Sequence, residues 1–415
     1  MVSSLGSKEE VGHYDDDGRS SSMVVDDVNT SAAYSNMDMQ QNATLADNHK
    51  NLSALRKPNW GERTFIVISR PLRGGLTNQI FMFQGIVMTA RERNCTQILL
   101  PSIQWRDHWG TRNLVQHDSI FDVDHWNSFY PLVPRLVEHD PMVFPGYNVT
   151  SERFDKASQM KKRNRTGHAN SGIELFYGRY QKFFSKYYHY TMVQRPRREL
   201  EDVIIYNGAL RPHPDIRHLV DQYILQTGLG TFLTLHARVE PDMQYHDYCR
   251  GDKVRELKQI LRMLYAKFPS PPSLLLSSKV LIAINRQSLE AVESNNTIGM
   301  ENLKLFRSIL ENGLWNGSVP VMEAGTAALD ETRFQQDCPS LCGALFNMEL
   351  AIQSSIFVGT PVSSWSVDVV LNRHYRNRTE NYYYVPGKTL RPVAEHFPRG
   401  RAFITNTSEP QPFTC

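Results

Sequence analysis

Short apolar runs alternate with amphipathic stretches through the second half of the chain, and no other feature limits the possible folds as strongly. Each run has the length and the apolar composition of a strand that is covered on both faces. The expected strands are 232–235, 280–284, 319–322 and 356–358, and the expected helices are 253–267, 300–312, 344–354 and 364–373. Strands separated by helices at this spacing predict a parallel α/β sheet.

The same pattern occurs once earlier in the chain. The β-branched run 65–68 predicts a buried strand, and a turn with two glycines follows it. Apolar residues over 78–93 are spaced at three or four, which indicates an amphipathic helix, and 98–101 is a second strand candidate. Strand, turn, helix and strand in this order open a second parallel α/β sheet.

The length agrees with this division, because 415 residues exceed one ordinary core and fit two domains plus some loose sequence. Residues 1–60 are rich in Ser, Asp, Asn and Met and show no periodicity, which predicts a disordered N-terminal stem. A first Rossmann-like domain is expected over 61–228 and a second over 229–415. Within the irregular segment 105–200, the basic tract 161–165 predicts a solvated loop.

Charge and targeting signals narrow the possible partners. The chain has 46 basic and 43 acidic residues, a formal net charge of +3, which gives no electrostatic case for nucleic-acid binding. No run approaches the ~20 apolar residues that cross a bilayer, so a membrane association would need an anchor that is absent from this sequence. Ten Asn-x-Ser/Thr sites, which accept glycans in secreted proteins, predict the secretory pathway, in the Golgi or endoplasmic reticulum lumen. The sites are Asn29, Asn42, Asn51, Asn94, Asn148, Asn164, Asn295, Asn316, Asn377 and Asn406.

The five cysteines leave the redox state open. Cys338 and Cys342 either close a small loop or remain two reduced thiols, and the odd count leaves one thiol over. A zinc site would need further Cys or His residues at ligand spacing, and the sequence offers too few of them. We therefore expect no structural metal.

Three segments lie where a parallel α/β sheet places its ligands, just beyond the carboxyl end of a strand. The first segment, 73–79, contains Gly74 and Gly75, which allow a backbone to approach a ligand closely. The helix that follows offers free amides to an anion. The pattern is not Gly-x-Gly-x-x-Gly, so a nicotinamide or flavin site is poorly supported. A plain turn before a helix explains the segment equally well.

In the second segment, 234–243, the ionisable residues His236, Arg238, Glu240 and Asp242 alternate along the chain. If the strand continues, all four side chains emerge on one face. They are costly to bury unless they pair with each other or with a ligand, so a salt-bridge cluster and a binding site are both open. Arg238 is the strongest candidate for a ligand contact among the four, because its planar guanidinium stays charged and can bind two phosphate oxygens at once.

In the third segment, 356–368, a buried strand runs into Gly359 and then into Ser363 and Ser364 at a predicted helix start. Either serine could serve only as a helix cap, which is the commonest use of serine at such a position. Hydroxyls and free amides at a helix N-terminus also form a cradle for a diphosphate, and this cradle needs no metal.

Together, in this order, the three segments resemble the GDP-fucose-dependent O-fucosyltransferase superfamily, which includes the protein O-fucosyltransferases and a large plant group. The run 74–76 with Asn78 and Gln79 is similar to the glycine-rich first motif of that family. His236-x-Arg238-x-Glu240-x-Asp242-Met243, with Cys249 shortly after it, is similar to the second motif of the plant branch. The third segment looks like the nucleotide-binding motif of the animal branch. The resemblance spans about residues 64–373.

The resemblance implies a GT-B-like architecture of two facing Rossmann-like domains, and an inverting, metal-independent transfer of fucose to a hydroxyl. GDP-fucose is the implied donor substrate, without a further cofactor, and the implied acceptor is a protein Ser/Thr or a glycan. By position, Arg238 would hold the β-phosphate and His236 would contact the nucleotide. Ser363 and Ser364 would bind phosphate, and Asn78 would lie near the reacting sugar.

The general base is open, because Gly75 or its neighbours occupy the place where some family members have a glutamate. Glu240 and Asp242 are the available carboxylates, and either could instead orient Arg238. Three rival functions are also open. Asp122-Val123-Asp124 has the form of a metal-dependent GT-A site, the donor could carry another sugar such as rhamnose, and the chain could bind a sugar nucleotide without catalysis.

Overall fold

The computed structural model describes fourteen ranges of the chain. They are 65–68, 75–92, 96–99, 102–106, 112–137, 174–177, 181–184, 206–241, 254–272, 279–292, 296–324, 329, 332–385 and 390–393. The predicted stem 1–60 and the predicted loop 161–165 lie outside these ranges. Contacts divide the chain into Met1–Ala54 and Leu55–Cys415, and every described element belongs to the second unit. The predicted boundary between residues 228 and 229 stays a prediction.

The first sheet has five strands in the order β5-β2-β1-β6-β7. Its strands are β1 (Phe65–Ile68), β2 (Gln97–Leu99), β5 (Arg135–Val137), β6 (Glu174–Tyr177) and β7 (Gln181–Phe184). Helix α2 (Leu76–Glu92) connects β1 to β2, which pair in parallel as predicted. Strand β5 also runs parallel to β2, but β6 is antiparallel to β1 and β7 is antiparallel to β6. The predicted parallel opening of this sheet is confirmed, but the sheet as a whole is mixed, because β6 and β7 extend it in the antiparallel sense.

Smaller elements follow this sheet in the chain. Strands β3 (Ser102–Arg106) and β4 (Arg112–Gln116) pair antiparallel, and the short helices η1 (His117–Ser119) and α3 (Val123–Ser128) come next. Helix α6 (Pro214–Thr227) leads into the second sheet. It begins with proline at its first position and ends at Gly228, whose φ of 58° only glycine adopts without strain.

The second sheet has six strands in the order β10-β9-β8-β11-β12-β13. Its strands are β8 (Leu233–His236), β9 (Val280–Ala283), β10 (Val321–Glu323), β11 (Ile356–Gly359), β12 (Asn381–Tyr383) and β13 (Arg391–Pro392). All neighbours run parallel except β12 and β13. The four strands predicted from the apolar runs are all present, within one or two residues at each end.

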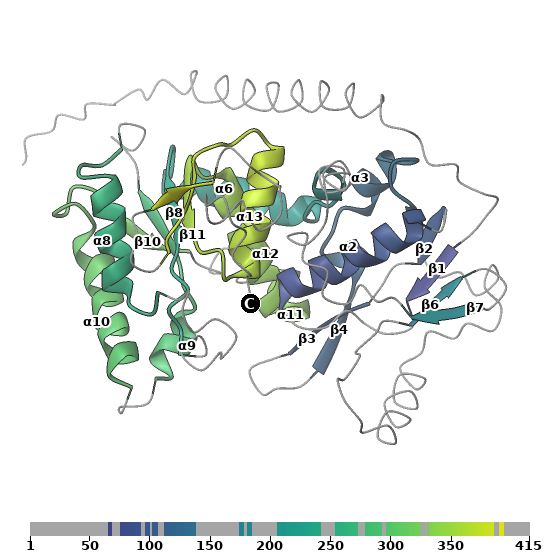
Figure 1. Cartoon of the computed structure of the whole chain (residues 1–415), viewed down its shortest axis with the longest axis horizontal. Helices are drawn as coiled ribbons and strands as arrows, with labels where there is room; N and C mark the ends of the chain where they lie inside the picture. The colour runs from purple at the N-terminus through teal and green to yellow at the C-terminus, as the bar shows by residue number, and fades with distance from the viewer. Residues whose placement is uncertain are drawn as a thin grey trace, which may run out of the picture. The chain divides into compact units, whose positions relative to one another are not determined.

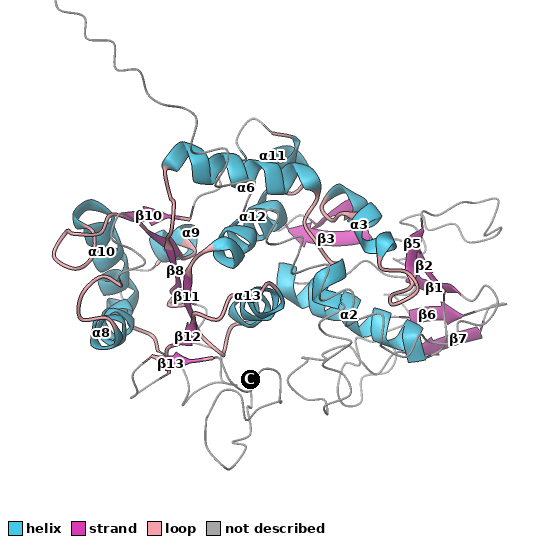
Figure 2. Ribbon diagram, turned by 90° about the horizontal axis from the view of Figure 1, so that it is seen from above, coloured by secondary structure: helices cyan, strands magenta, loops and turns pink. Residues whose placement is uncertain are grey.

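Helices cover both faces of the second sheet, as Figures 1 and 2 show. Helices α8 (Leu257–Lys267), α9 (Arg286–Glu290) and α10 (Thr297–Asn312) lie on one face. Helices α11 (Arg333–Asp337), α12 (Pro339–Gln353) and α13 (Ser364–Tyr375) follow β10 and β11, and α12 and α13 cover the other face. Each predicted helix of this region is thus confirmed, and the α/β class with mostly parallel sheets is confirmed.

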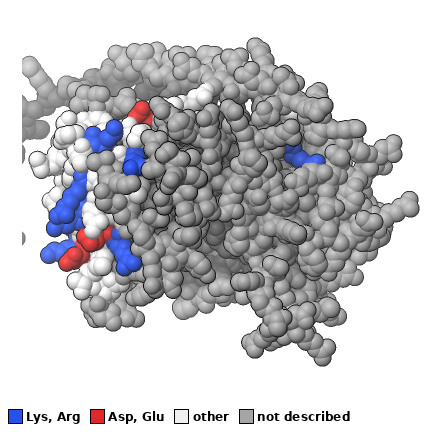
Figure 3. Space-filling view, in the orientation of Figure 1, with Lys and Arg blue, Asp and Glu red and all other residues white. Residues whose placement is uncertain are grey.

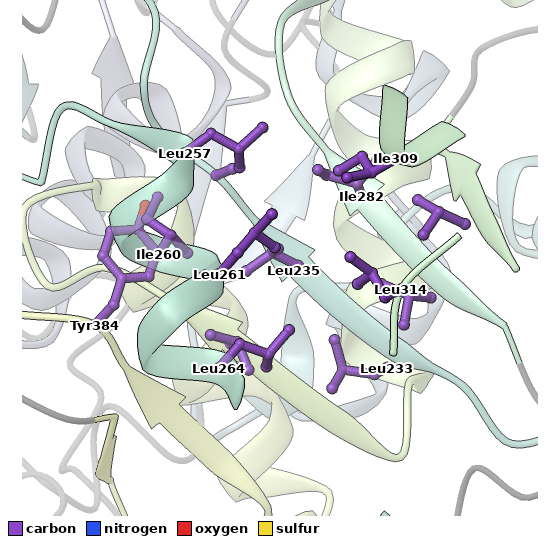
Figure 4. Close-up of a cluster of buried hydrophobic side chains, with 14 of the residues drawn as sticks. Leu233, Leu235, Leu257, Ile260, Leu261, Leu264, Ile282, Ile309, Leu314 and Tyr384 are labelled. Atoms are coloured by element: carbon purple, nitrogen blue, oxygen red, sulfur yellow. The ribbon is translucent and has the colours of Figure 1, made fainter. Parts of the chain in front are cut away.

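Every second residue of the central strands packs into one buried cluster beneath α8 and α10 (Figure 4). Leu233 and Leu235 of β8 and Ile282 of β9 point into it, and Leu257, Ile260, Leu261 and Leu264 of α8 cover them. Burial of such side chains stabilises a fold by roughly 2 kcal/mol each. Side chains that recur every two residues along the strands pack against side chains that recur every 3.6 residues along the helix. These two periods let the sequence predict which segments form strands and which form helices.

The strand order places a topological switch point between β8 and β11. From β8 the chain moves outward through β9 and β10, and then returns to pair β11 with the opposite edge of β8. In open α/β sheets the carboxyl ends of the two strands at such a point frame the ligand site. Here β8 ends at the second segment, and β11 ends at the third.

Within the described ranges, no helix combines the length and the apolar character that crossing a bilayer requires.

Candidate functional site

Side-chain hydrogen bonds bring the three segments together at the switch point. His236 of the second segment contacts Ser366 of the third, with 2.7 Å between the imidazole Nδ1 and the hydroxyl Oγ. Thr77 of the first segment contacts Ser364 of the third, with 2.9 Å between the two hydroxyl oxygens. Figure 2 shows α2 beside α13, in agreement with this second contact. Residues far apart in sequence therefore surround the beginning of α13.

Arg238 and Glu240 form an ion pair at the end of β8. The guanidinium Nη1 donates to the Glu240 Oε2 at 2.6 Å, and the Glu240 Oε1 accepts from the backbone N–H of Asn285 at 3.0 Å. Glu240 is 4% exposed, whereas the Arg238 side chain remains 25% exposed. The carboxylate is thus held from both sides, and it holds a cation that still reaches the surface.

The backbone around Arg238 is fixed by a tyrosine that follows β12, the strand on the far side of β11 from β8. The Tyr384 hydroxyl accepts from the Arg238 N–H at 2.9 Å and donates to the His236 carbonyl at 3.0 Å. Strand β8 ends at His236, so the condition under which all four ionisable side chains would share one face of a strand is not met. Ala237 and Val239 nevertheless stay in the core beneath α8, and His236 contacts α13 on the opposite side.

His236 is buried against the start of α13. Its ring lies 4.5 Å from the Trp365 ring, centroid to centroid, and its Nδ1 pairs with Ser366. The Ser366 Oγ also accepts from the Thr360 N–H at 3.1 Å. Burial, with a smaller contribution from the Arg238 charge, lowers the pKa of His236 to about 3. The imidazole is therefore neutral at physiological pH and acts through hydrogen bonding or packing.

Ser363 and Ser364 stand at the N-terminus of α13, as predicted. Ser363 is the N-cap residue, but its side chain makes no capping hydrogen bond. Ser364 is half-buried, and its hydroxyl bonds to Thr77 rather than to the helix backbone. The interpretation of these serines as simple caps is therefore not supported by the described contacts.

The starts of two helices meet at the Thr77–Ser364 contact. Thr77 is the second residue of α2, and Ser364 is the first residue of α13. Neither helix has an acidic residue in its first turn. Each helix start carries a partial positive charge of about one half and unpaired amides. Two helix starts therefore contribute positive potential here, and Arg238, which is paired with Glu240, lies two residues beyond His236.

The two glycines described at the site have different surroundings. A Cβ added to Gly75 would meet no atom within 4 Å, so space is open beside the start of α2. A Cβ on Gly359 would lie 2.6 Å from the Ser366 Oγ and 2.7 Å from the Phe357 ring. Gly359 is thus required for packing α13 against β11, whereas Gly75 borders free space.

Several predicted site residues have no described side chain. Gly74 and Asp242 lie outside the described residues, as does Cys249. Asn78 lies in α2, but its side chain is not among those that the structure describes. The roles proposed for these residues stay predictions.

The sequence did not reveal four further residues of the site. Thr77, Asn285, Ser366 and Tyr384 hold its members together through the contacts given above. Thr77 and Ser366 stand inside segments that were already singled out, so their hydroxyls were a usable signal. Asn285 acts through its backbone amide, and Tyr384 lies beyond the third segment, so no local pattern marks them.

Asp122, the first carboxylate of the rival Asp-x-Asp motif, has structural partners. Its Oδ1 accepts from the His125 N–H at 2.9 Å and so caps α3, while its Oδ2 pairs with the Arg217 Nη2 at 3.0 Å. Within the described ranges, no group of three or more His, Cys, Asp or Glu residues could hold a metal ion. Both carboxylate oxygens of Asp122 are therefore engaged in holding α3 and α6.

Cys338 and Cys342 form a disulfide at the beginning of α12, which decides between the two states that the sequence left open. Both residues are fully buried. The other cysteines, Cys95, Cys249 and Cys415, lie outside the described residues.

A buried carboxylate lies on α13, one turn beyond Ser364. Asp368 is 1% exposed, and neither of its oxygens has a hydrogen-bond partner in the described part of the chain. Burial raises its pKa to about 7. It lines a small cavity of about 10 Å³ together with Asn207, Glu349, Asn372 and Arg376.

Surface charges near α8 and α10 are mixed. On the face shown in Figure 3, described Lys and Arg side chains stand next to Asp and Glu side chains. Arg286 pairs with Glu290 and Glu323, and Arg307 also reaches Glu290. Such interspersed charges do not form the basic stripe that a nucleic-acid backbone needs.

No protein-family model and no curated protein sequence matches the chain. Among solved structures, POFUT1 in complex with GDP has a TM-score of 0.46 at 12% identity, over 78% of this chain and 99% of that one. POFUT1 in complex with GDP-fucose gives 0.44 at 14%, over 81% and 98%. The fucosyltransferase NodZ from Bradyrhizobium gives 0.39 at 14%, over 80% and 99%. All three TM-scores lie below 0.5 and all three identities below 15%, so the donor and the reaction of this chain have to be inferred from its own side chains.

Proposed function

We propose that this chain is an inverting, metal-independent glycosyltransferase that moves fucose from GDP-fucose to a hydroxyl group of a protein or a glycan. One observation carries the proposal: three separate segments, each of which contributes a cationic or partly positive group, meet at the switch point of the second sheet. These groups are the guanidinium of Arg238 and the starts of α2 and α13, which the Thr77–Ser364 contact joins.

A diphosphate leaving group suits this arrangement. As the bond between sugar and β-phosphate breaks, negative charge grows on the phosphate while the sugar becomes cationic. Donors that are already aligned stabilise that charge without reorganisation. Arg238 is aligned by Glu240 and by the Tyr384 hydroxyl, so its side chain can meet the β-phosphate. Ser363, Ser364 and the first amides of α13 would hold the remaining phosphate oxygens.

The neutral His236 fits a role in nucleotide contact better than a role in proton transfer. A group with a pKa of about 3 is a weak base at physiological pH. Glu240 fits the positioning of Arg238 better than a base role, because both of its oxygens already accept hydrogen bonds. Asp242 and Asn78 remain as candidates for the base and for the sugar contact, respectively.

Two other functions remain as alternatives. The same site would accept a different nucleotide sugar, such as a rhamnose donor, because the cationic groups recognise only the diphosphate. A sugar-nucleotide-binding protein without catalysis would also use them. Retention of GDP binding without any sugar transfer or donor hydrolysis would favour this second alternative.

The compartment proposed for this activity is the lumen of the secretory pathway. A buried disulfide between Cys338 and Cys342 is typical of oxidising compartments, and the glycan-acceptor sites of the sequence agree with it. Of these sites, Asn316 and Asn377 lie in the described ranges, and both are exposed.

The test of the function is a donor comparison with the purified full chain. Release of GDP or UDP is followed with GDP-fucose, GDP-mannose and UDP-rhamnose, with and without excess chelator. We expect release from GDP-fucose alone and no loss with chelator. Release from UDP-rhamnose instead would overturn the donor assignment, and loss of release in chelator would overturn the metal-independent mechanism.

A further inference from the structure

Thr77 stands out because it joins two parts of the site that no predicted residue joined. Its hydroxyl lies 2.9 Å from the Ser364 hydroxyl, across 287 positions of sequence. Among the described residues, this is the only side-chain hydrogen bond recorded for either hydroxyl. The contact therefore determines how the Ser364 side chain can act.

The direction of this hydrogen bond follows from the exposure of its partners. Two hydroxyls carry two hydrogens, and the bond between them uses one. Thr77 is 6% exposed, whereas Ser364 is half-buried. If Ser364 donated, the spare hydrogen would be on the buried Thr77. If Thr77 donates, the spare hydrogen is on Ser364, where a ligand can reach it.

The surroundings favour the second arrangement. Ser364 is the first residue of α13, and the first-turn amides of that helix favour an anion beside it. An anion there attracts the Ser364 hydrogen, and a hydroxyl that accepts one hydrogen bond donates its own hydrogen more strongly. Thr77 would also fix the rotation of the Ser364 side chain before the ligand arrives, which lowers the entropic cost of binding.

We propose that Thr77 is a positioning residue that donates to Ser364 and thereby directs the Ser364 hydroxyl hydrogen at a bound diphosphate. This inference rests on the proposed function for its ligand class, and it adds a residue that acts through Ser364 without touching the sugar. The first segment then contributes to donor binding through the third segment as well as through its own helix start.

The test compares Thr77→Val, which keeps the shape of the side chain and removes the hydroxyl, with Thr77→Ser, which keeps the hydroxyl. Ser364→Ala and the double variant Thr77→Val/Ser364→Ala complete a thermodynamic cycle. Affinity is measured by calorimetry with two probes, GDP and inorganic pyrophosphate. Thermal unfolding of each variant controls for changes in the fold.

We expect Thr77→Val to weaken the binding of both probes about fivefold, the size of one hydrogen bond, while Thr77→Ser stays within about twofold of the wild type. In the Ser364→Ala background, Thr77→Val should have no further effect, because its partner is gone. With GDP-fucose the KM should rise by the same factor, while kcat changes less than about twofold.

Three results would overturn the proposal. Equal weakening by Thr77→Val in both backgrounds would show that Thr77 acts without Ser364. Tighter binding by Thr77→Val would show that Ser364 donates to Thr77 and competes with the ligand. Failure of the wild type to bind pyrophosphate would show that the site does not recognise a diphosphate. If pyrophosphate binds and the four variants give the expected thermodynamic cycle, but GDP-fucose is not turned over, then the proposed function is wrong and the role of Thr77 stands.

Discussion

The carboxylate of Glu240 links the ends of two neighbouring strands through Arg238. It accepts from the Arg238 Nη1 at 2.6 Å on one oxygen and from the Asn285 backbone N–H at 3.0 Å on the other. Asn285 follows β9 and caps α9, so the ion pair is anchored to a rigid part of the second sheet. A guanidinium held in this way is pre-aligned for an anion.

Substitution of Glu240 by Gln tests whether this carboxylate positions Arg238 or acts as the general base. Glutamine keeps an acceptor for Asn285 but loses the charge that holds the guanidinium. Because a hydrogen bond between charged groups contributes about 1.5–3 kcal/mol, we expect kcat/KM to fall roughly 10- to 100-fold. GDP affinity should fall as well.

GDP affinity decides between the two roles of Glu240. A general base does not touch the leaving group, so its loss would abolish transfer and leave the calorimetric affinity for GDP unchanged. That result would assign Glu240 to proton transfer. Arg307→Ala, at an exposed position of α10, is the control and should alter neither quantity.

The glycines Gly359 and Gly75 should respond in opposite ways to alanine. In Gly359→Ala the new methyl group would lie 2.6 Å from the Ser366 Oγ, so α13 must shift, at a cost of roughly 1–3 kcal/mol. The midpoint of thermal unfolding should drop by several degrees. Gly75→Ala faces open space and should leave the midpoint unchanged. A large loss of stability in Gly75→Ala would contradict the described surroundings.

Asp368 should make the free energy of unfolding depend on pH between about 4 and 7. Burial raises its pKa from 3.8 to about 7. Below pH 4 both the folded and the unfolded chain hold the proton, and between the two values only the folded chain does. Stability from this group is therefore greatest in acid, falls as the pH rises to 7, and then stays level. The upper limit of the loss is about 4 kcal/mol.

Asp368→Asn removes this titration, so the difference in unfolding free energy between the variant and the wild type should grow from pH 4 to pH 8. Burial lowers the pKa values of His117 and His236 to about 3, so these two groups lower the stability of the fold in acid. Both histidines are present in the wild type and in the variant, so their contributions cancel in the difference between the two unfolding free energies. The exposed Asp215, changed to Asn, serves as the control. Parallel pH profiles for wild type and Asp368→Asn would contradict a carboxylate that is buried without a hydrogen-bond partner among the described residues.

Asp122→Ala should lower stability without affecting donor binding. The variant loses both the cap of α3 and the ion pair with Arg217, for a combined cost of roughly 1–2 kcal/mol. Calorimetric GDP affinity should remain within about twofold of the wild type. A loss of GDP affinity restored by added Mg²⁺ or Mn²⁺ would instead favour the metal-dependent rival.

The second sheet was predictable because its central strands β8, β9 and β11 are buried on both faces, so an apolar run such as 356–358 marks a strand without any need for alternation. The first sheet was less predictable. Strands β6 and β7 come from a segment without regular spacing. Strand β6 pairs antiparallel with β1, and β7 pairs antiparallel with β6, and neither pairing leaves a local signal in the sequence. Parallel pairing was inferred only where a helix separated two runs.

The candidate site divides in the same way. His236, Arg238 and Ser364 stand at strand or helix ends, where the topology of an α/β sheet places ligands, so the sequence could identify them. The contact between Thr77 and Ser364 depends on how two distant helices pack. Arg373 is a further case: it looks like a basic residue near a helix end, yet it is fully buried and donates to the carbonyls of Ala351, Ile352 and Ser355. Such roles follow from tertiary contacts, which a local pattern does not encode.

The most direct measurement is a calorimetric titration of the full chain with GDP, repeated with Arg238→Ala and with Arg307→Ala as the matched surface control. We expect GDP to bind the wild type and the Arg307 variant equally. Loss of Arg238 should cost several-fold or more in GDP affinity and on the order of 3 kcal/mol in the transition state of transfer. Unchanged GDP affinity and unchanged turnover in Arg238→Ala would contradict the proposed role of Arg238.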